Sequence, residues 1–288
     1  MSQIPIGVLH PGAMGSTVGR ALSKAGNSVF WASAGRSAAT AARAEQEGFV
    51  AVFDIATLVT ETSVIVSICP PHASESVVDL VAAAGFKGLF IDANAITPSR
   101  SAKQRDRISG AGGRYVDGSV IGPPADEAGT TRLYLSGSGS PEAAALFEGG
   151  LLEAIPLGGN DFAASALKMT YAAYTKGSAA LLLAVSATAN QLDVEDALRR
   201  EWTLSMPDLP ARADRLLEFA GRKAWRFEEE MRYIAETMAA AGVPDGFHLA
   251  AAEIYRRISG QLDSDFPVDA YQTLSDLSAA DAYPSASK

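Results

Sequence analysis

A glycine turn close to the start of the chain has the spacing that most directly suggests chemistry. An apolar run ends at Leu9, Gly12 and Gly15 follow, and a helix-forming stretch continues to Lys24. In the dinucleotide-binding fingerprint one glycine makes the turn, a second lets the backbone approach a pyrophosphate, and a third lets helix and strand pack closely. Gly12 and Gly15 suit the second and third roles, and His10 stands in the first. The same glycines would also serve a plain strand–turn–helix.

The context of the turn favours nucleotide binding, because the turn joins a strand to a helix and starts an alternating strand–helix series. The amino end of the helix offers unpaired N–H groups and the positive end of a dipole to a phosphate. We therefore predict that a dinucleotide contacts the residues of this turn, which are His10, Pro11, Gly12, Ala13 and Met14.

The end of the second predicted strand indicates which dinucleotide is preferred. An Asp or Glu normally binds the free ribose 2′-OH at this point, but none occurs between Asn27 and Ala44. Ser33, Arg36 and Ser37 stand there instead, and a guanidinium suits a 2′-phosphate. The sequence thus predicts NADP rather than NAD. The alternative is that Arg36 only solvates the start of a helix.

Lys168 is a candidate proton donor in an unusually apolar setting, beside Ala166, Leu167 and Met169. A desolvated lysine can protonate the alkoxide that hydride transfer to a carbonyl creates. Tyr171 and Thr175 follow at helical spacing on the same face. From the spacing alone, a lysine extending from a helix edge to solvent is the favoured interpretation.

Composition excludes several classes of protein. The 288 residues include 48% hydrophobic and 20% charged side chains, which is typical of a globular protein with a core. The net charge of −9 disfavours nucleic acid and anionic membranes as partners. Cys69 is the single cysteine and the three histidines are far apart, so we expect no disulfide and no metal site. The apolar run over residues 179–185 is too short to span a bilayer, and without a signal peptide we expect a cytoplasmic protein.

The first half of the chain alternates short β-branched runs with Ala-rich helical stretches. The predicted strands are Ile4–Leu9, Ser28–Trp31, Ser63–Ile68, Gly88–Asp92, Arg114–Asp117, Arg132–Ser136 and Leu152–Pro156. This alternation predicts an α/β fold, a doubly wound and mostly parallel Rossmann sheet with helices on both faces.

The character of the sequence changes after Gly159. A long Ala- and Leu-rich helix is predicted from Asn160 to Leu192, and the following segments, including 210–232 and 231–241, are also helical. We predict an NADP-binding Rossmann domain over 1–159 and an all-helical substrate and dimerisation domain over 160–288, joined by that interdomain helix. Because the helix is apolar over much of its surface, we expect a homodimer.

Five segments, in order, resemble the β-hydroxyacid dehydrogenase superfamily, which includes 6-phosphogluconate and 3-hydroxyisobutyrate dehydrogenases. They are GVLHPGAMG, VSICPPHAS, FIDANAITP, DGSVIGPPADEAGTTRLYLSG and SALKMTYAAYTKG. The helical C-terminal region resembles that of a phosphogluconate-dehydrogenase-like subgroup. The sequence departs from the family pattern where His10 and Pro123 replace glycines, Ile121 replaces a serine, and Tyr171 or Ala172 replaces an asparagine.

The resemblance implies a role for each matching position. Cys69, Pro70 and Pro71 would line the nicotinamide ribose, and Asn94 would contact both cofactor and substrate. Ser119 and Gly122 would contact substrate, and Lys168 would be catalytic. From their helical spacing, and not from the resemblance, Tyr171 and Thr175 are expected to orient Lys168 or to hydrogen-bond the substrate. With Ile121 and Tyr171 in place of polar residues, we expect a bulkier or more apolar substrate than a simple hydroxypropionate.

The sequence thus predicts an NADP-dependent oxidoreductase that transfers a hydride between NADP(H) and a small, carboxylate-bearing hydroxyacid or its carbonyl form. Lys168 would be its general acid and base. Imine reduction on the same fold is an alternative, although imine reductases usually lack this lysine. A non-catalytic NADP-binding protein is the third possibility.

Overall fold

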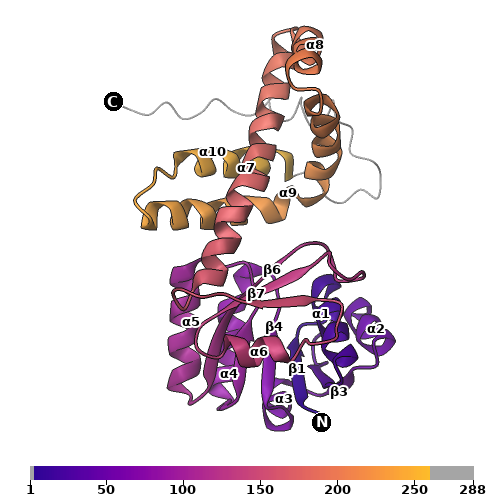
Figure 1. Ribbon diagram of the computed structural model, residues 1–288, viewed down its shortest axis with the longest axis vertical. Coiled ribbons are helices and arrows are strands. Elements are labelled where there is room, and N and C mark those ends of the chain that lie inside the picture. The colour runs from indigo at the N-terminus through magenta and orange to yellow at the C-terminus, as the bar shows by residue number, and fades with distance from the viewer. Residues whose placement is uncertain (1–2, 260–288) are drawn as a thin grey trace. The chain divides into compact units, whose positions relative to one another are not determined.

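An eight-stranded sheet forms the first half of the protein. The computed structural model describes residues 3–259, and Figure 1 shows its elements. The strands lie in the order β3-β2-β1-β4-β5-β6-β7-β8. Neighbouring strands are parallel except β6 and β7, which are antiparallel. The strands are β1 (Pro5–Leu9), β2 (Ser28–Ala32), β3 (Val50–Val52), β4 (Val64–Ser67), β5 (Leu89–Asp92), β6 (Arg114–Ile121), β7 (Arg132–Ser136) and β8 (Glu153–Pro156).

This order is that of a doubly wound Rossmann domain, which confirms the predicted fold class. Six α-helices and a short 3₁₀ turn connect the strands over these residues. They are α1 (Ala13–Lys24), α2 (Ala38–Gln46), α3 (Ile55–Glu61), η1 (Pro71–Ala73), α4 (Ser74–Ala83), α5 (Pro98–Gly110) and α6 (Ser140–Ala145).

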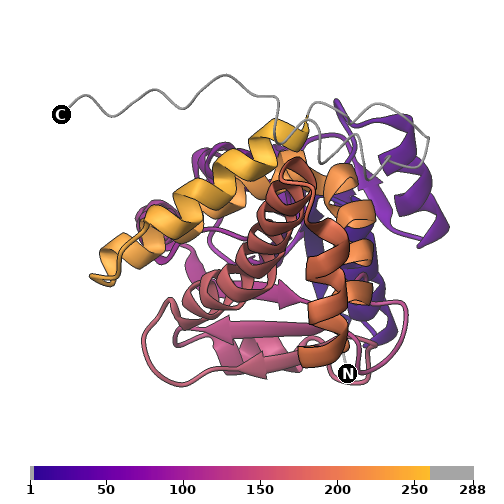
Figure 2. The ribbon, with the colours of Figure 1, turned by 90° about the horizontal axis from the view of Figure 1, so that it is seen from above.

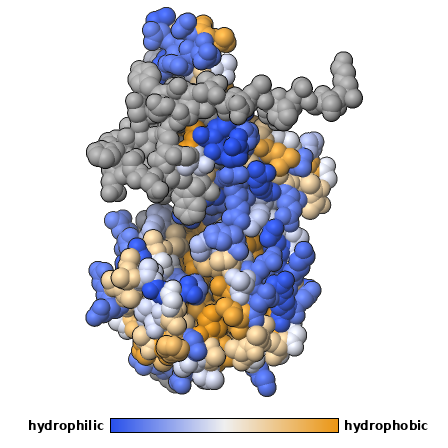
Figure 3. Space-filling model, turned by 180° about the vertical axis from the view of Figure 1, so that it is seen from behind, coloured by the Kyte–Doolittle hydropathy of each residue, from blue (hydrophilic) through white to orange (hydrophobic). Residues whose placement is uncertain are grey.

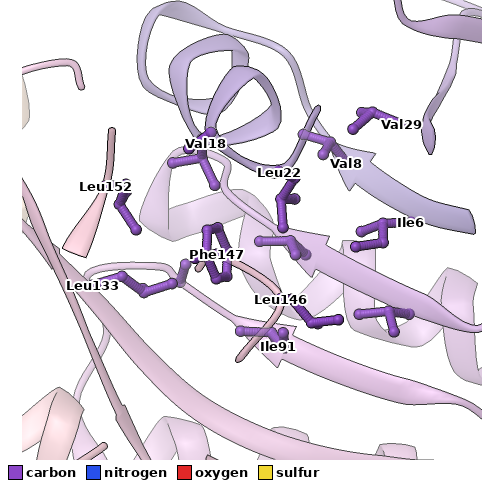
Figure 4. Close-up of a cluster of buried hydrophobic side chains, with 14 of the residues drawn as sticks. Ile6, Val8, Val18, Leu22, Val29, Ile91, Leu133, Leu146, Phe147 and Leu152 are labelled. Carbon is purple, nitrogen blue, oxygen red and sulfur yellow. The ribbon is translucent and has the colours of Figure 1, made fainter. Parts of the chain in front are cut away.

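Two hydrophobic clusters lie on the two faces of the sheet, because the strands are buried on both sides. In β1, Ile6 and Val8 belong to one cluster and Leu9 to the other. The first cluster, drawn in Figure 4, packs α1, α2 and α6 against the sheet, with Val18, Leu22 and Phe147 at its centre. The second cluster packs α3, α4 and α5 on the opposite face. Ligand-binding side chains are therefore expected at the strand ends rather than on either face.

The second half of the chain is helical. It contains α7 (Ala163–Gln191), α8 (Glu195–Ser205), α9 (Leu209–Ala240) and α10 (Gly246–Ile258), and α9 and α10 lie side by side (Figure 2). The stretches predicted over 210–232 and 231–241 are one helix, α9. The chain divides into two compact units between Met169 and Thr170, within α7. The predicted boundary at 159/160 stays a prediction, and residues 260–288 of the predicted helical domain lie outside the described residues.

The surface drawn in Figure 3 intersperses hydrophilic and hydrophobic side chains. Within residues 3–259, no helix has the length and apolar character needed to cross a membrane. The same residues contain no group of three or more His, Cys, Asp or Glu side chains that could hold a metal ion.

Candidate active site

The candidate site lies at one edge of the Rossmann sheet, where four adjacent strands end or pass in register. Leu9 of β1 pairs with Ser67 of β4, Ser67 with Asp92 of β5, and Asp92 with Asp117 of β6. The turns that follow are tied together, since His10 N–H donates to the Ile68 carbonyl over 2.9 Å. This arrangement brings the predicted cofactor residues of β1, β4 and β5 to a single edge.

The glycine turn forms the amino end of α1. The structure explains the glycine at position 15 and the glycine at position 12 in different ways. A Cβ atom on Gly15 would lie 2.0 Å from the His10 carbonyl oxygen, so only glycine allows helix and strand to approach this closely. A Cβ atom on Gly12 would meet nothing within 4 Å, and its φ of −74° suits any residue. No part of the described chain therefore requires a glycine at position 12. The space beside it suits a pyrophosphate bound by the first N–H groups of α1.

His10 is half-buried within the turn. Burial, and secondly the positive charge of Arg36, lower the pKa of the His10 imidazole to about 4, so the ring is neutral at neutral pH. Its Nδ1 atom is buried and has no hydrogen-bond partner within residues 3–259. A buried polar atom without a partner is costly, and a phosphate oxygen at this turn would satisfy it.

The loop after β2 contains the three predicted 2′-phosphate ligands, Ser33, Arg36 and Ser37. The Ser33 hydroxyl donates to the Val52 carbonyl, and the Ser37 hydroxyl caps α2 by accepting from Thr40 N–H. Arg36 is exposed, and its guanidinium forms no hydrogen bond or ion pair in the described part of the chain. Arg36 is thus available to an external anion, whereas the two serine hydroxyls already have intramolecular partners.

The ends of β4 and β5 are joined by Asn94. Its buried Oδ1 atom accepts from Cys69 N–H over 2.7 Å, and its Nδ2 atom donates to Ser67 and Asp92. The Asn94 side chain thus holds the two turns together, and its predicted contacts with cofactor and substrate stay predictions. Pro70 is exposed and Pro71 begins the 3₁₀ turn, while burial raises the pKa of the Cys69 thiol to about 12.

Strand β6 continues four residues past Asp117 and carries the predicted substrate segment. The Ser119 side chain is 1% exposed, and its hydroxyl has no partner in the described chain. Gly122 ends the strand with a φ of +129°, and a Cβ atom there would lie 2.4 Å from the Thr130 carbonyl oxygen. The β6–β7 loop therefore requires this glycine, whether or not it contacts substrate.

Lys168 lies in the first two turns of α7, directly beside β6. Its Nζ atom donates to the Val120 carbonyl over 2.8 Å. One turn earlier, Ser165 donates to Asp117 through both its N–H, at 2.8 Å, and its hydroxyl, at 2.5 Å. Strand β6 thus holds the start of α7 at two points, and it places the lysine amine at the end of the strand that carries Ser119.

Tyr171 and Thr175, the other two predicted site residues of α7, belong to the second compact unit. The Tyr171 side chain is half exposed, and the Thr175 hydroxyl donates to the Tyr171 carbonyl over 3.2 Å. Their predicted roles beside Lys168 stay predictions.

Two buried aspartates were not singled out from the sequence. Asp92 and Asp117 are each 1% exposed, and burial raises the pKa of both carboxyls, that of Asp92 to about 7. Tyr115 and Ser101 lie between them. An acidic residue inside a buried strand, in FIDANA and in YVDGSV, is the signal that could have identified them.

A cavity of about 270 Å³ lies away from this edge, at the start of β6. Two of the residues that line it, Arg105 and Arg114, are paired with Asp161 and Glu142. The cavity is therefore not a ready anion site.

Comparisons with known proteins gave two matching family models. The family model described as NAD binding domain of 6-phosphogluconate dehydrogenase matches residues 5–154, and a domain of unknown function, DUF1932, matches residues 189–258. No curated protein matches the chain.

Solved structures of similar fold include enzymes of two kinds. A 3-hydroxyisobutyrate dehydrogenase from Mycobacterium tuberculosis, with L-serine, is 20% identical with a TM-score of 0.72 over 96% of this chain and 100% of its own. An imine reductase variant from Myxococcus stipitatus, with NAD+, is 16% identical with a TM-score of 0.57 over 96% and 99%. A reductive aminase from Aspergillus terreus, with NADPH and ethyl levulinate, is 16% identical with a TM-score of 0.57 over 95% and 99%.

Proposed function

The chain belongs to the family of 6-phosphogluconate dehydrogenase NAD-binding domains, within the β-hydroxyacid dehydrogenase-like superfamily, and on that premise we propose an NADP-dependent hydroxyacid dehydrogenase. It transfers a hydride between NADP(H) and a hydroxyacid-like alcohol or its carbonyl form, with Lys168 as general acid and base. The observation that carries this proposal is the Lys168 amine, held 2.8 Å from the Val120 carbonyl at the end of β6.

The dinucleotide is held by the turns at the sheet edge. The N–H groups of Ala13 and Met14, at the amino end of α1, bind the pyrophosphate in the space beside Gly12, and His10 donates from its partnerless nitrogen. Cys69, Pro70 and Pro71 line the nicotinamide side at the end of β4. When bound, the nicotinamide ring supplies or accepts the hydride.

The preference for NADP rests on Arg36. An exposed guanidinium without an intramolecular partner in the described chain suits a 2′-phosphate, and no carboxylate stands nearby in sequence to bind a free 2′-OH. Ser33 and Ser37 shape the loop that presents this arginine.

Lys168 moves the proton of the reaction. In the oxidation direction its neutral amine accepts the hydroxyl proton of the substrate, and in reduction its ammonium returns that proton to the alkoxide. Tyr171 and Thr175, three and seven residues further along α7, share the face of Lys168 and orient it or the substrate.

The substrate is a small molecule that carries a carboxylate. The buried Ser119 hydroxyl, which has no partner within residues 3–259, is a neutral donor for such a group, together with the backbone at Gly122, while Asn94 holds the neighbouring turns in place. Ile121, buried where the resembling family has serine, makes the site less polar and favours a bulkier hydroxyacid.

Substitution of Lys168 by alanine tests the proposal. We expect turnover of β-hydroxyacids with NADP+ to fall by about 10²–10⁴-fold, while calorimetry shows NADPH affinity within a factor of about two, because Lys168 donates to Val120 of β6 and not to a residue of the glycine turn. Lys103→Ala, an exposed lysine on α5, is the matched control and should change neither quantity.

Two outcomes would point elsewhere. Unchanged turnover in Lys168→Ala would remove the lysine from the mechanism, and efficient reduction of cyclic imines by that variant would favour the imine reductases of similar fold. NADPH binding without turnover of any hydroxyacid or imine would favour a non-catalytic nucleotide-binding protein.

We also propose that the protein is a homodimer. Helix α7 leaves Tyr174, Leu181 and Val185 at 70%, 51% and 36% exposure. Apolar side chains spaced seven and eleven residues apart form one stripe of a helix, and a second copy of the chain would cover it.

A further inference from the structure

The buried polar groups between β5, β6, α5 and α7 form a continuous chain. The Tyr115 hydroxyl lies 3.1 Å from Asp92 Oδ2 and 2.9 Å from the Ser101 hydroxyl, and the Ser101 hydroxyl lies 2.7 Å from Asp117 Oδ1. Three hydrogen bonds in series require three protons. The two hydroxyls supply two of them, so the third belongs to one of the carboxyls.

The hydrogen bonds to each carboxyl identify which one is protonated. Asp117 accepts from the hydroxyls of Ser101 and Ser165 and from the Ser165 N–H, and a fourth donor, the Ser136 hydroxyl, divides its single proton between Asp117 and the Asp161 carbonyl. Asp92 Oδ1 accepts only from Asn94, through its N–H and its Nδ2 atom. Four donors stabilise the charged form of Asp117. The proton is therefore assigned to Asp92 Oδ2, and the Tyr115 hydroxyl, which donates to this oxygen when Asp92 is ionised, accepts from it instead.

No cation pairs with either carboxyl in the described chain. The titratable groups nearest them are Tyr115 on β6 and Cys69 after β4, while α5, β7 and α7 contribute serines. Two ionised carboxylates side by side across β5 and β6 would repel each other. One shared proton removes that repulsion and leaves a single charge at the amino end of α7, where a helix dipole favours an anion.

We propose that Asp117 is a positioning residue for Lys168, acting as the one ionised carboxylate of this pair while Asp92 carries the proton. The anion fixes Ser165, Ser165 sets the first turn of α7, and the next turn then places Lys168 against Val120. Asp117 and Val120 are three residues apart on β6, and their partners Ser165 and Lys168 are three residues apart on α7. The catalytic consequence rests on the proposed function, but the positioning itself does not.

The test compares three variants. Asp92→Asn keeps a donor toward Tyr115 and an acceptor for Asn94, so it should behave as the wild type. Asp117→Asn presents an amide to four donors and should release the start of α7. Ser165→Ala removes only the hydroxyl link and keeps the carboxylate, so it tests the proposal even where Asp117→Asn fails to fold. Thr188→Ala, which removes an exposed hydroxyl further along α7, is the matched control.

The first readout needs no substrate. Acetic anhydride labelling followed by mass spectrometry measures the reactivity of Lys168 against that of exposed Lys103. We expect Ser165→Ala and Asp117→Asn to raise the labelling rate of Lys168 by about tenfold, the factor that corresponds to one lost hydrogen bond. Asp92→Asn and Thr188→Ala should leave the rate unchanged. Infrared spectra should show a protonated-carboxyl band that is absent in Asp92→Asn and present in Ser165→Ala.

The second readout is turnover. Ser165→Ala should lower kcat by about 10–100-fold, the effect of a displaced catalytic group, with NADPH affinity unchanged. Equal labelling of Lys168 in all variants, or a labelling increase in Asp92→Asn as large as in Asp117→Asn, would overturn the positioning role. The expected labelling pattern in a protein that turns over no substrate would support positioning and refute the dehydrogenase.

Discussion

Gly12 and Gly15 are separated by two residues, yet the structure predicts opposite consequences for an alanine at each. Gly12 has a φ of −74° and a ψ of −166°, which alanine adopts readily, and its Cβ position faces open space. Gly12→Ala should therefore raise the free energy of unfolding by about 0.4–1 kcal/mol, because alanine restricts the unfolded chain.

The same methyl group should weaken NADPH binding. It would occupy the space through which the backbone approaches the pyrophosphate. A methyl group forced into a packed contact costs about 1–3 kcal/mol, so we expect the NADPH dissociation constant to rise by about 10–100-fold. The Gly12→Ala protein would be slightly more stable than the wild type but deficient in cofactor binding.

Gly15→Ala should destabilise the protein itself. Alanine gains about 1 kcal/mol over glycine within a helix. Its Cβ atom, however, would lie 2.0 Å from the His10 carbonyl oxygen, and this backbone atom cannot rotate away. With overpacking at the upper end of its range, about 3 kcal/mol, the net loss is about 2 kcal/mol.

Urea unfolding without cofactor measures the first quantity, and calorimetric titration with NADPH measures the second. Wild-type NADPH affinity in Gly12→Ala would show that the open space is not the pyrophosphate site. Equal destabilisation of the two variants would show that the local packing at these glycines is not as described.

Three further predictions concern selectivity, pH and assembly. Arg36→Ala should weaken NADPH binding by about 10–100-fold and leave NADH binding unchanged. The loss of NADPH affinity should be smaller at high salt, because Arg36 is exposed. Equal losses of NADPH and NADH affinity in calorimetry would contradict NADP selectivity. The pKa of His10 is about 4 in the folded protein and about 6.5 in the unfolded chain. Between these pH values only the unfolded chain binds the proton, so the free energy of unfolding falls by about 2–3 kcal/mol as the pH drops from about 6.5 to about 4. Urea unfolding should show this loss in the wild type and not in His10→Asn. Leu181→Arg should yield monomers in sedimentation velocity, and an unchanged sedimentation coefficient would place the dimer contact elsewhere.

Much of the Rossmann half could be predicted, because its buried strands are short β-branched runs bounded by turns. Strand β3 was missed although its residues, Val50–Val52, are apolar, because the strand is only three residues long. Strand β6 is longer than predicted, because its second half is paired with the antiparallel strand β7. Helix α9 was divided in the prediction, although no helix-breaking residue lies at residue 231.

The site was harder to predict because its groups meet only through strand register. Ser33 and Ser37 stand beside an arginine and resemble phosphate ligands, yet one bonds a neighbouring strand and the other caps a helix. Asp92 and Asp117 are 25 residues apart in sequence, and they become partners only because β5 and β6 pair residue 92 with residue 117. Sequence spacing contains no information on that pairing.

The positions at which the sequence departs from the family pattern bear on whether the protein is catalytic. Ile121 and Tyr171 replace polar residues of the family pattern, whereas Lys168 and Asp117, which holds the start of α7 through Ser165, match that pattern. Asp117 and Ser165 would hold the start of α7 in a catalytic or a non-catalytic protein alike, because their hydrogen bonds join that helix to β6. The feature that bears on catalysis is the Lys168 amine at the end of β6, and with a less polar substrate side it supports the proposed dehydrogenase of a bulkier hydroxyacid over a nucleotide-binding protein without chemistry.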